Sequence, residues 1–338
     1  MSNSLLKNDS PKYTEIHTAK KRALLAIEMQ KVANKIHEIF PKTHLLNACP
    51  CCSASTISKF TEKFGFSIDI CLRCQHLFTN PFPSRAALEY YYNSDFKDFE
   101  NEFFLESFES RIPLFTRRID LIEALSAGCN VLDVGSAVGI FIAANKRMGG
   151  RLNITACDVN NSSCEYLKAA YPGLAVINKD VMELESANFD VVTLWDTFEH
   201  IPDPIGLLKA VKRQIKPHGY FVFSTPNTKS FEWSVMRDSH VQLLPPGHVN
   251  LYNSSNIVTI LQKNGYVVED IKTMNPLLDL TYVKNILESS DSSDSILGRA
   301  AAHLIEIVFF EENLQVIENA MRDRLMAGNM VVVAKKDD

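Results

Sequence analysis

The sequence predicts an α/β protein built on an open, doubly wound sheet of mostly parallel strands. From residue 128 onward, short apolar runs alternate with helical stretches, which is typical of βαβ units. Acidic residues follow several of these runs, and sheets of this kind bind ligands at the carboxyl ends of their strands. A separate cysteine-rich segment at 45–80 predicts a small second module.

The composition is that of an ordinary soluble globular protein, with 338 residues, 46% apolar and 22% charged. A net charge of −5 gives no general attraction for a polyanion, which weakens a nucleic-acid function. No apolar run is long enough to predict a membrane span, and the N-terminus lacks the apolar core of a signal peptide. We therefore expect a cytoplasmic protein whose eight cysteines are thiols or metal ligands.

The chain divides into four predicted parts. We expect an N-terminal helical segment over 1–44, a cysteine module over 45–84 and a helical linker or lid over 85–127. The main domain follows over 128–338, with a helical insertion at about 276–328. Within the first part, a helix is predicted over 15–40 because apolar residues recur at steps of four and three. These residues are Leu25, Met29, Val32, Ile36 and Ile39.

Seven short apolar runs are the predicted strands of the main domain. They lie at 130–135, 153–159, 174–181, 189–196, 219–226, 266–272 and 329–336. The turn after the first strand, in VLDVGSAVGIF, is a candidate cofactor loop. Gly135 and Gly139 are four residues apart, and Ile140 stands where a dinucleotide fingerprint needs its last glycine. No Gly-Lys-Ser/Thr follows, so the loop fits neither a dinucleotide nor a Walker site.

Carboxylates gather at the predicted strand ends and indicate the kind of ligand. These residues are Asp133, Asp158, Asp180, Asp196 and Glu199. Five carboxylates would repel a pyrophosphate, but they suit a ligand with positive charge and free hydroxyls. S-adenosylmethionine (SAM) is such a ligand, because it carries a sulfonium, an ammonium, a ribose diol and an adenine amine.

Each part of SAM has a candidate partner. Asp158 can accept both ribose hydroxyls, Asp180 can accept from the adenine amine beside Val181, and the glycines let the backbone approach the methionine part. The expected cofactor-binding residues are Asp133, Gly135, Ser136, Ala137, Gly139, Asp158, Val159, Asp180, Val181, Trp195 and Asp196.

Residues 110–275, with the last strand at 330–336, resemble the class I SAM-dependent methyltransferases, in particular the subset related to ubiquinone-type O-methyltransferases. VLDVGSAVG is similar to that family's first motif, FDVVTLWDTFEHIPDP to its strand-four motif and IKPHGYFVFSTPN to its strand-five motif. The resemblance implies a Rossmann-like, seven-stranded sheet with an antiparallel last strand, in an enzyme of class EC 2.1.1.-. Ala137 departs from the family's usual glycine, and we expect binding to be retained with a shifted loop.

Two C-x2-C pairs, separated by 18 residues, match a zinc-site spacing. The predicted ligands of a structural, zinc-ribbon-like site are Cys49, Cys52, Cys71 and Cys74. We interpret Cys51 as a bystander and His76 as an alternative ligand. Similar modules precede methyltransferase domains in some enzymes that modify deoxysugars and other bacterial metabolites.

The catalytic candidates are His200, as a general base, and Glu199. The alternative is that this pair shapes the pocket floor and the helix start. His240, His248 and Tyr252 are either substrate contacts or packing residues. The aromatic stretch at 90–108 is either a lid over the acceptor or a buried helix face.

Three functions remain open at this point. The first is methylation, at oxygen, of a small-molecule acceptor such as a sugar, nucleotide sugar or secondary metabolite, without nucleic acid or membrane partners. The second is RNA-base methylation, in which the zinc module holds nucleic acid. The third is a noncatalytic SAM-binding scaffold. The 276–328 segment is a candidate for acceptor selectivity or for a homodimer interface.

Overall fold

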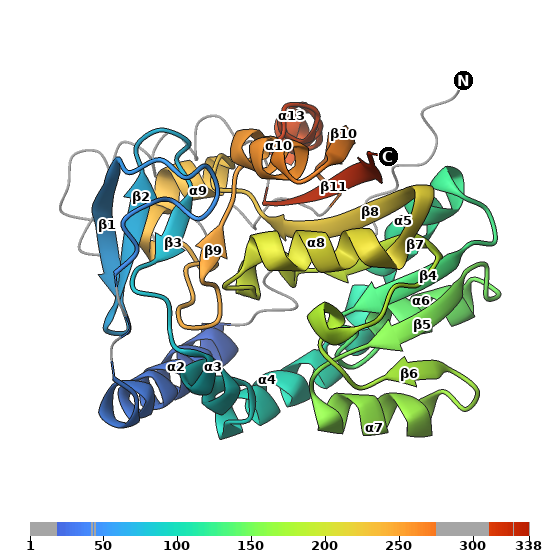
Figure 1. The fold of residues 1–338 in the computed structure, drawn as a ribbon, viewed down its shortest axis with the longest axis horizontal. Helices are drawn as coiled ribbons and strands as arrows, with labels where there is room; N and C mark the ends of the chain where they lie inside the picture. Colours follow the sequence, from blue (N-terminus) through green and yellow to red (C-terminus); the bar gives the residue numbers. More distant parts are fainter. Residues whose placement is uncertain (1–18, 42, 44, 275–310, 327, 338) are drawn as a thin grey trace.

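The computed structural model describes residues 19–274, except 42 and 44, and residues 311–337, except 327. Its centre is a seven-stranded sheet with the order β10-β11-β8-β7-β4-β5-β6 (Figure 1). β4, β5, β6, β7 and β8 pair in parallel, while β11 is antiparallel to both β8 and β10. The predicted Rossmann-like sheet and its antiparallel last strand are thus confirmed.

All seven predicted strands of the main domain are present. They are β4 (Asn130–Val134), β5 (Asn153–Cys157), β6 (Ala175–Ile177), β7 (Phe189–Trp195), β8 (Ile215–Pro226), β10 (Tyr266–Lys272) and β11 (Asn329–Lys336). Neighbouring residues such as Val131 and Leu132 are both fully buried, because helices cover both faces of the sheet. This burial explains why the central strands appear in the sequence as continuous apolar runs.

Helices cover the two faces of the sheet in separate layers. Side chains of α5 (Phe108–Leu125) and α6 (Ile140–Arg147) form one core with Val131, Val191 and Val222. The other core contains side chains of α8 (Pro204–Gln214) and α10 (Ser254–Lys263). α7 (Asn161–Ala170) packs beside β6, and α13 (Glu311–Asp323) precedes β11 in the chain. The doubly wound arrangement is confirmed.

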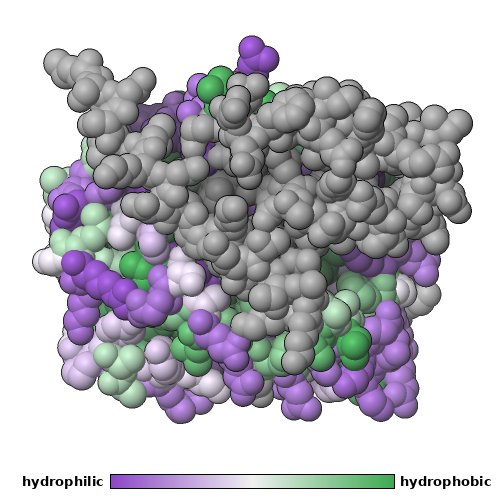
Figure 2. All heavy atoms as spheres, turned by 180° about the vertical axis from the view of Figure 1, so that it is seen from behind, coloured by the Kyte–Doolittle hydropathy of each residue, from purple (hydrophilic) through white to green (hydrophobic). Residues whose placement is uncertain are grey.

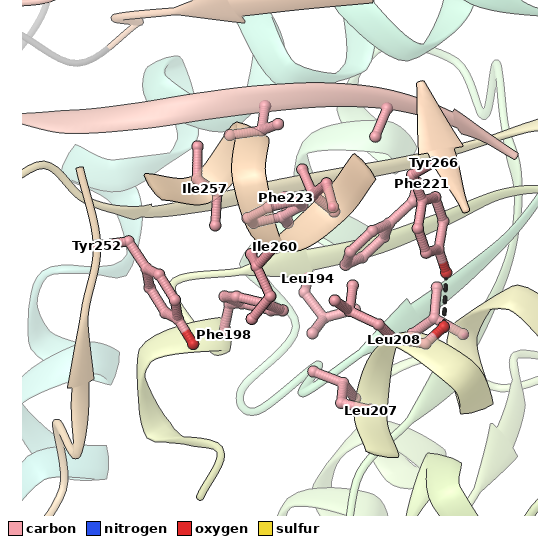
Figure 3. Packing of buried hydrophobic residues seen from close by; sticks show 14 of the residues in the cluster. Leu194, Phe198, Leu207, Leu208, Phe221, Phe223, Tyr252, Ile257, Ile260 and Tyr266 are labelled. Carbon is pink, nitrogen blue, oxygen red and sulfur yellow. Dashed lines mark hydrogen bonds between the residues drawn. The ribbon is translucent and has the colours of Figure 1, made fainter. Parts of the chain in front are cut away.

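Figure 3 shows the core on the α8 and α10 face, where rings from several segments meet. The Phe198 ring lies 4.8 Å from Phe223 and 5.0 Å from Tyr252, centroid to centroid. The Tyr266 hydroxyl donates to the Leu208 carbonyl at 2.7 Å, which satisfies its buried polar atom. This core connects the end of β7 to α10 and to the segment after β8.

The N-terminal helices form a third packed group. They are α2 (Ala19–Ile39), α3 (Arg85–Tyr92) and α4 (Asp95–Glu106). Met29, Val32 and Ile36 of α2 are buried in one cluster with Tyr91 and Phe96. The helix predicted over 15–40 is therefore present from residue 19, and its first residues lie outside the described chain. Ile39 is 52% exposed, because it lies at the end of the helix, beyond the packed face.

The cysteine module contributes a second sheet and is not packed separately. β1 (Ile57–Lys63), β2 (Phe66–Cys71) and β3 (Leu77–Thr79) are joined by β9 (Asn250–Leu251) from the main domain. β3 and β9 pair antiparallel, and Cys49, Cys51, Cys52 and Cys71 belong to the same core cluster as α8 and α10. The predicted boundary at residue 84 is therefore crossed by both a sheet and a core.

The remaining described elements are short. They are α9 (Phe231–Met236) and the 3-10 turns η1 (Val181–Glu183), η2 (Phe198–His200) and η3 (Arg237–Ser239). Of the predicted insertion at 276–328, residues 276–310 lie outside the described chain. The described helices include none that is both long and apolar enough to cross a bilayer. On the reverse face, Figure 2 shows hydrophilic and hydrophobic residues intermixed where described side chains are visible.

Candidate functional site

The loop between β4 and α6 has an unusual backbone. Gly135, Ala137 and Gly139 have φ angles of +75°, +45° and +76°. A Cβ on Gly135 would lie 2.6 Å from Thr197 Oγ1, so neither the backbone nor the neighbouring turn accepts a side chain there. Ala137 adopts the left-handed conformation in spite of its Cβ, at a cost of roughly 1–2 kcal/mol.

Asp158, at the end of β5, holds this loop in place. Its carboxylate accepts the backbone N–H of Ala137 at 2.8 Å and that of Asn160 at 2.8 Å. Burial raises the pKa of Asp158, while these N–H donors act in the opposite direction. The side chain therefore connects the first two strand ends and still has lone pairs for a ligand's hydroxyls.

Asp180 and its neighbours form the adjacent edge. The Asp180 carboxylate accepts the N–H of Met182 at 2.9 Å and caps the turn η1. Val181 is buried, whereas Val159 is 63% exposed. These residues can provide the polar and apolar contacts that an adenine ring requires.

Two of the five predicted carboxylates are enclosed by the protein. Asp133 is 2% exposed and accepts from the Thr193 hydroxyl at 2.7 Å, and burial raises its pKa to about 7. Glu199 is 1% exposed and accepts from the Thr225 hydroxyl at 3.0 Å, and burial raises its pKa to about 8. At neutral pH these groups are partly or mostly protonated, so the expected ring of five open negative charges is reduced.

Arg118, on α5, is a charged residue of this region that sequence analysis missed. Its side chain is 2% exposed, and its guanidinium lies over the rings of Phe115 and Trp195, 4.2 and 4.7 Å from their centroids. One nitrogen, Nη2, contacts Asp196 Oδ2 at 3.3 Å. Within the described chain, Nε and Nη1 are buried without a hydrogen-bond partner. A buried cation with free donors is costly unless a ligand completes its contacts.

Asp196 follows β7 in a left-handed conformation, with φ of +51°. Its carboxylate accepts from the Ser224 hydroxyl at 3.0 Å and from the Asn329 side-chain amide at 2.7 Å. Trp195 is mostly buried, with its ring 5.4 Å from that of Phe141. The antiparallel last strand therefore contributes a residue that orients the acid at the end of β7.

His200 lies beside two aromatic partners. The hydroxyl of Tyr92 is 3.3 Å from His200 Nδ1, and the rings of His200 and His248 are 4.6 Å apart. Burial, assisted by His248, holds the pKa of His200 well below its usual value. His200 is therefore neutral at pH 7, as a general base must be.

The aromatic stretch and the other candidates have separate roles. Tyr91 is buried in the α2 core, whereas Tyr92 reaches His200, so the stretch contains both packing and site residues. Tyr252 is fully buried, and His240 is 3% exposed with its ring 4.5 Å from Trp233. Both side chains are thus enclosed by the protein. His248, by contrast, lies at the site, with Nδ1 2.7 Å from the Gln242 carbonyl oxygen.

The four predicted zinc ligands converge. The Sγ atoms of Cys49 and Cys74 are 3.7 Å apart, and those of Cys52 and Cys71 are 3.6 Å apart. All four lie within 4.8 Å of one another. Tetrahedral Zn–S bonds of about 2.3 Å place sulfurs about 3.8 Å apart, so the donor set fits zinc.

Cys51 and His76 do not join this cluster. Cys51 Sγ contacts the Asn256 carbonyl at 3.4 Å, which fits the expected bystander. His76 is fully buried, and its Nε2 contacts Asn250 Oδ1 at 2.9 Å. A second group with metal-ligand spacing is formed by Glu199, His200 and His248.

Comparisons with known proteins agree with this fold. A family model described as a methyltransferase domain matches residues 104–271. A ubiquinone biosynthesis O-methyltransferase from Thiobacillus denitrificans is 32% identical over 183 residues, which cover 49% of this chain and 76% of the relative. A protein of the same name from Paraburkholderia phymatum is 30% identical over 165 residues, covering 44% of this chain and 70% of the relative.

Solved structures give more distant similarities. A SAM-dependent methyltransferase from Archaeoglobus fulgidus aligns with a TM-score of 0.46 and 22% identity, over 69% of this chain and 98% of that chain. A SAM-dependent methyltransferase from Aquifex aeolicus aligns with a TM-score of 0.41 and 18% identity, over 67% and 93%. The family match begins after the cysteine module, which is an addition to the matched region.

Gly135→Ala and Ala137→Gly are a matched pair of changes in one loop. The first places a Cβ against Thr197 Oγ1, so we expect the Kd for SAM to rise at least about tenfold. The second relieves a left-handed alanine and should leave the Kd within about twofold. Isothermal titration calorimetry measures both, with circular dichroism as the control for folding. Unchanged SAM binding by Gly135→Ala would show that this loop does not contact the donor.

Cys52→Ser and Cys51→Ser test the metal cluster. We expect about one zinc ion per chain in the wild-type protein, and loss of zinc with a lower Tm in Cys52→Ser. Cys51→Ser should keep its zinc, because the Cys51 sulfur contacts a carbonyl rather than the cluster. Elemental analysis and thermal melting provide the readouts. Equal zinc contents in the two variants would rule out the four-cysteine site.

Proposed function

This chain belongs to the class I SAM-dependent methyltransferases, and we propose that it methylates a hydroxyl group of a small-molecule acceptor. The observation that carries the proposal is the place of His200 in the turn η2 that follows β7, beside Tyr92 and His248, where burial lowers its pKa. The relatives are named as O-methyltransferases, which supports oxygen as the acceptor atom. Sugars, nucleotide sugars and hydroxylated secondary metabolites are the acceptor classes to test.

The proposed reaction is an in-line displacement. The acceptor oxygen attacks the methyl carbon of SAM, the carbon–sulfur bond breaks, and S-adenosylhomocysteine leaves. The hydroxyl proton passes to His200 and then to solvent. Because the sulfonium already activates the methyl group, the protein's main contribution is to align the reactants and accept this proton.

His200 is the proposed base and Glu199 a supporting residue. Contacts with the Tyr92 hydroxyl and the His248 ring orient the His200 ring. Glu199, with its raised pKa, keeps its proton for most of the time at pH 7 and is therefore a poor base there. The buried hydrogen bond that Glu199 accepts from the Thr225 hydroxyl instead fixes the turn that carries His200.

Donor binding in this proposal uses the strand-end residues and Arg118. Asp158 accepts the ribose hydroxyls, and Asp180 with Val181 contacts adenine. The free N–H groups of Arg118, on Nε and Nη1, donate to the carboxylate of SAM, which serves as their counter-ion. The zinc cluster is assigned a structural role, because four thiolates leave no open coordination position.

His200→Gln should lower kcat by about 10²-fold or more while leaving the Kd for SAM unchanged, because only the proton acceptor is lost. Since the pKa of His200 is depressed, its active neutral form persists as pH falls. Wild-type kcat/KM should therefore stay flat through pH 6.5 and decline only below it.

Transfer of a labelled methyl group from SAM to a panel of hydroxylated acceptors measures both quantities. His218→Gln, the same change at an exposed position, is the matched control and should leave the rate unchanged. A wild-type rate in His200→Gln would leave His200 with only a structural role. Labelling of total RNA in place of small molecules would overturn the proposed acceptor class, and donor binding without transfer would favour a scaffold.

Arg118→Met tests the donor's carboxylate contact. Methionine fits the aromatic surroundings of Arg118 and removes an incompletely paired buried charge, so the donor-free variant should be no less stable than the wild type. Its Kd for SAM should nevertheless rise by about 10- to 100-fold, as for a lost charged hydrogen bond. Calorimetry and thermal melting are the measurements. An unchanged Kd would exclude Arg118 from the donor site.

A further inference from the structure

A cavity of about 460 Å³ lies between the cysteine cluster and α10. Its lining residues are Cys52, Arg73, Cys74, Gln75, Lys229, Ser255, Asn256, Thr259 and Lys263. None of these belongs to the donor or acceptor regions described above. The volume is within the range of small-molecule sites, and the space is partly open to solvent, so a compact ligand can enter it. We refer to this space as the basic cavity.

The basic cavity concentrates positive charge on a chain with a net charge of −5. Arg73, Lys229 and Lys263 line it, and no carboxylate is among its lining residues. Lys229 Nζ donates to Ser255 Oγ at 2.8 Å, and Lys263 Nζ donates to the Cys52 carbonyl at 3.2 Å. Within the described chain, these two lysines contact neutral atoms, and Arg73 has no hydrogen-bond or ion-pair partner. Three cations around one cavity thus lack a counter-ion there.

Neutral donors complete the lining. Ser255 accepts from Lys229, so its own hydroxyl hydrogen is available to a ligand. Gln75, another lining residue, is exposed and carries two amide hydrogens. The Asn253 side chain already accepts the N–H groups of Ser255 and Asn256. Recognition in the basic cavity would therefore rely on side chains rather than on free backbone amides of α10.

The zinc cluster offers a competing reason for this charge. Zn²⁺ with four thiolates carries a net charge of −2, and Cys52 and Cys74 border the basic cavity. The three positive charges of Arg73, Lys229 and Lys263 exceed the two negative charges of a zinc–thiolate cluster. Lys263 contacts the carbonyl oxygen of Cys52, which is one of the predicted zinc ligands. Removal of the cations should affect zinc retention if they serve the metal, and anion binding if they serve a ligand.

We propose that the basic cavity binds the phosphate group of a small-molecule ligand, at a site separate from the methyl donor. Arginine and lysine with hydroxyl and amide donors are the groups that recognise phosphate oxygens. The ligand chemistry is a phosphate group, either as free inorganic phosphate or as part of a nucleotide. A second anion site beside the cysteine module explains a cluster of cations that the methyl-transfer site does not use.

The test is calorimetric titration of the full-length, zinc-loaded protein with inorganic phosphate, pyrophosphate and a nucleoside diphosphate at constant ionic strength. We expect saturable binding that weakens by about tenfold or more in the Arg73→Gln/Lys263→Gln double variant. Lys168→Gln, which removes one positive charge at an exposed position on α7, is the control and should leave binding unchanged. Tighter binding of the nucleoside diphosphate than of pyrophosphate would support a nucleotide source, and equal binding would support phosphate alone.

Zinc content and SAM affinity are measured on the same samples. They distinguish phosphate binding from a role of the cations in zinc retention and from effects on the donor site. We expect both to be unchanged in the double variant. Absence of phosphate binding by the wild-type protein would overturn the proposal, as would equal weakening in Lys168→Gln. Loss of zinc without any phosphate effect would show that the cations serve the metal, and binding of RNA alone would assign the surface to nucleic acid. Failure of methyl transfer leaves these titrations unaffected.

Discussion

The packing of Phe198 is the contact on which the rest of the structure depends. Its ring is fully buried between Phe223 of the central sheet and Tyr252, in the core that α10 completes (Figure 3). Glu199 and His200 are the next two residues, so the same contact determines where the candidate catalytic turn lies. Loss of this ring would leave a large cavity at the meeting point of sheet, turn and module.

The shared core also explains why the cysteine module is continuous with the main domain. A module of this size buries little apolar surface alone, and it commonly depends on a metal or on neighbouring structure. Here the four-cysteine cluster is the proposed metal site, and β9 provides neighbouring structure through the pairing of Leu77 with Leu251. Metal loss is thus expected to reach the main domain through β9 and α10.

Features encoded in short stretches of the chain could be predicted from sequence. The seven strands, the glycine-containing loop after the first strand and the C-x2-C pairs depend on local apolar runs, backbone freedom or spacing. The structure therefore contains these features at the predicted positions. The strand-end acids were also located correctly along the chain, because parallel strands bring their carboxyl ends to one edge.

Features created by distant segments could not be predicted. The sequence of α5 does not indicate that the guanidinium of Arg118 lies over the rings of Phe115 and Trp195. Tyr92 reaches His200 across 108 positions of sequence. The enclosure of Asp133 depends on Thr193 from a neighbouring strand. In each case the chemistry of the side chain depends on its neighbours in the folded structure. Those neighbours come from distant parts of the sequence, so the residue type alone does not reveal them.

Arg118 and the acids around it also account for the charge preference of the proposed donor site. SAM carries a sulfonium, an ammonium and a carboxylate, so it needs one cationic and at least one anionic contact. Arg118 supplies the first, and its field lowers the pKa values of Asp133 and Glu199 against the effect of burial. When a donor carboxylate neutralises Arg118, that field weakens. The donor's own positive groups can then take its place beside the acids, so the two ends of the ligand support each other's binding electrostatically.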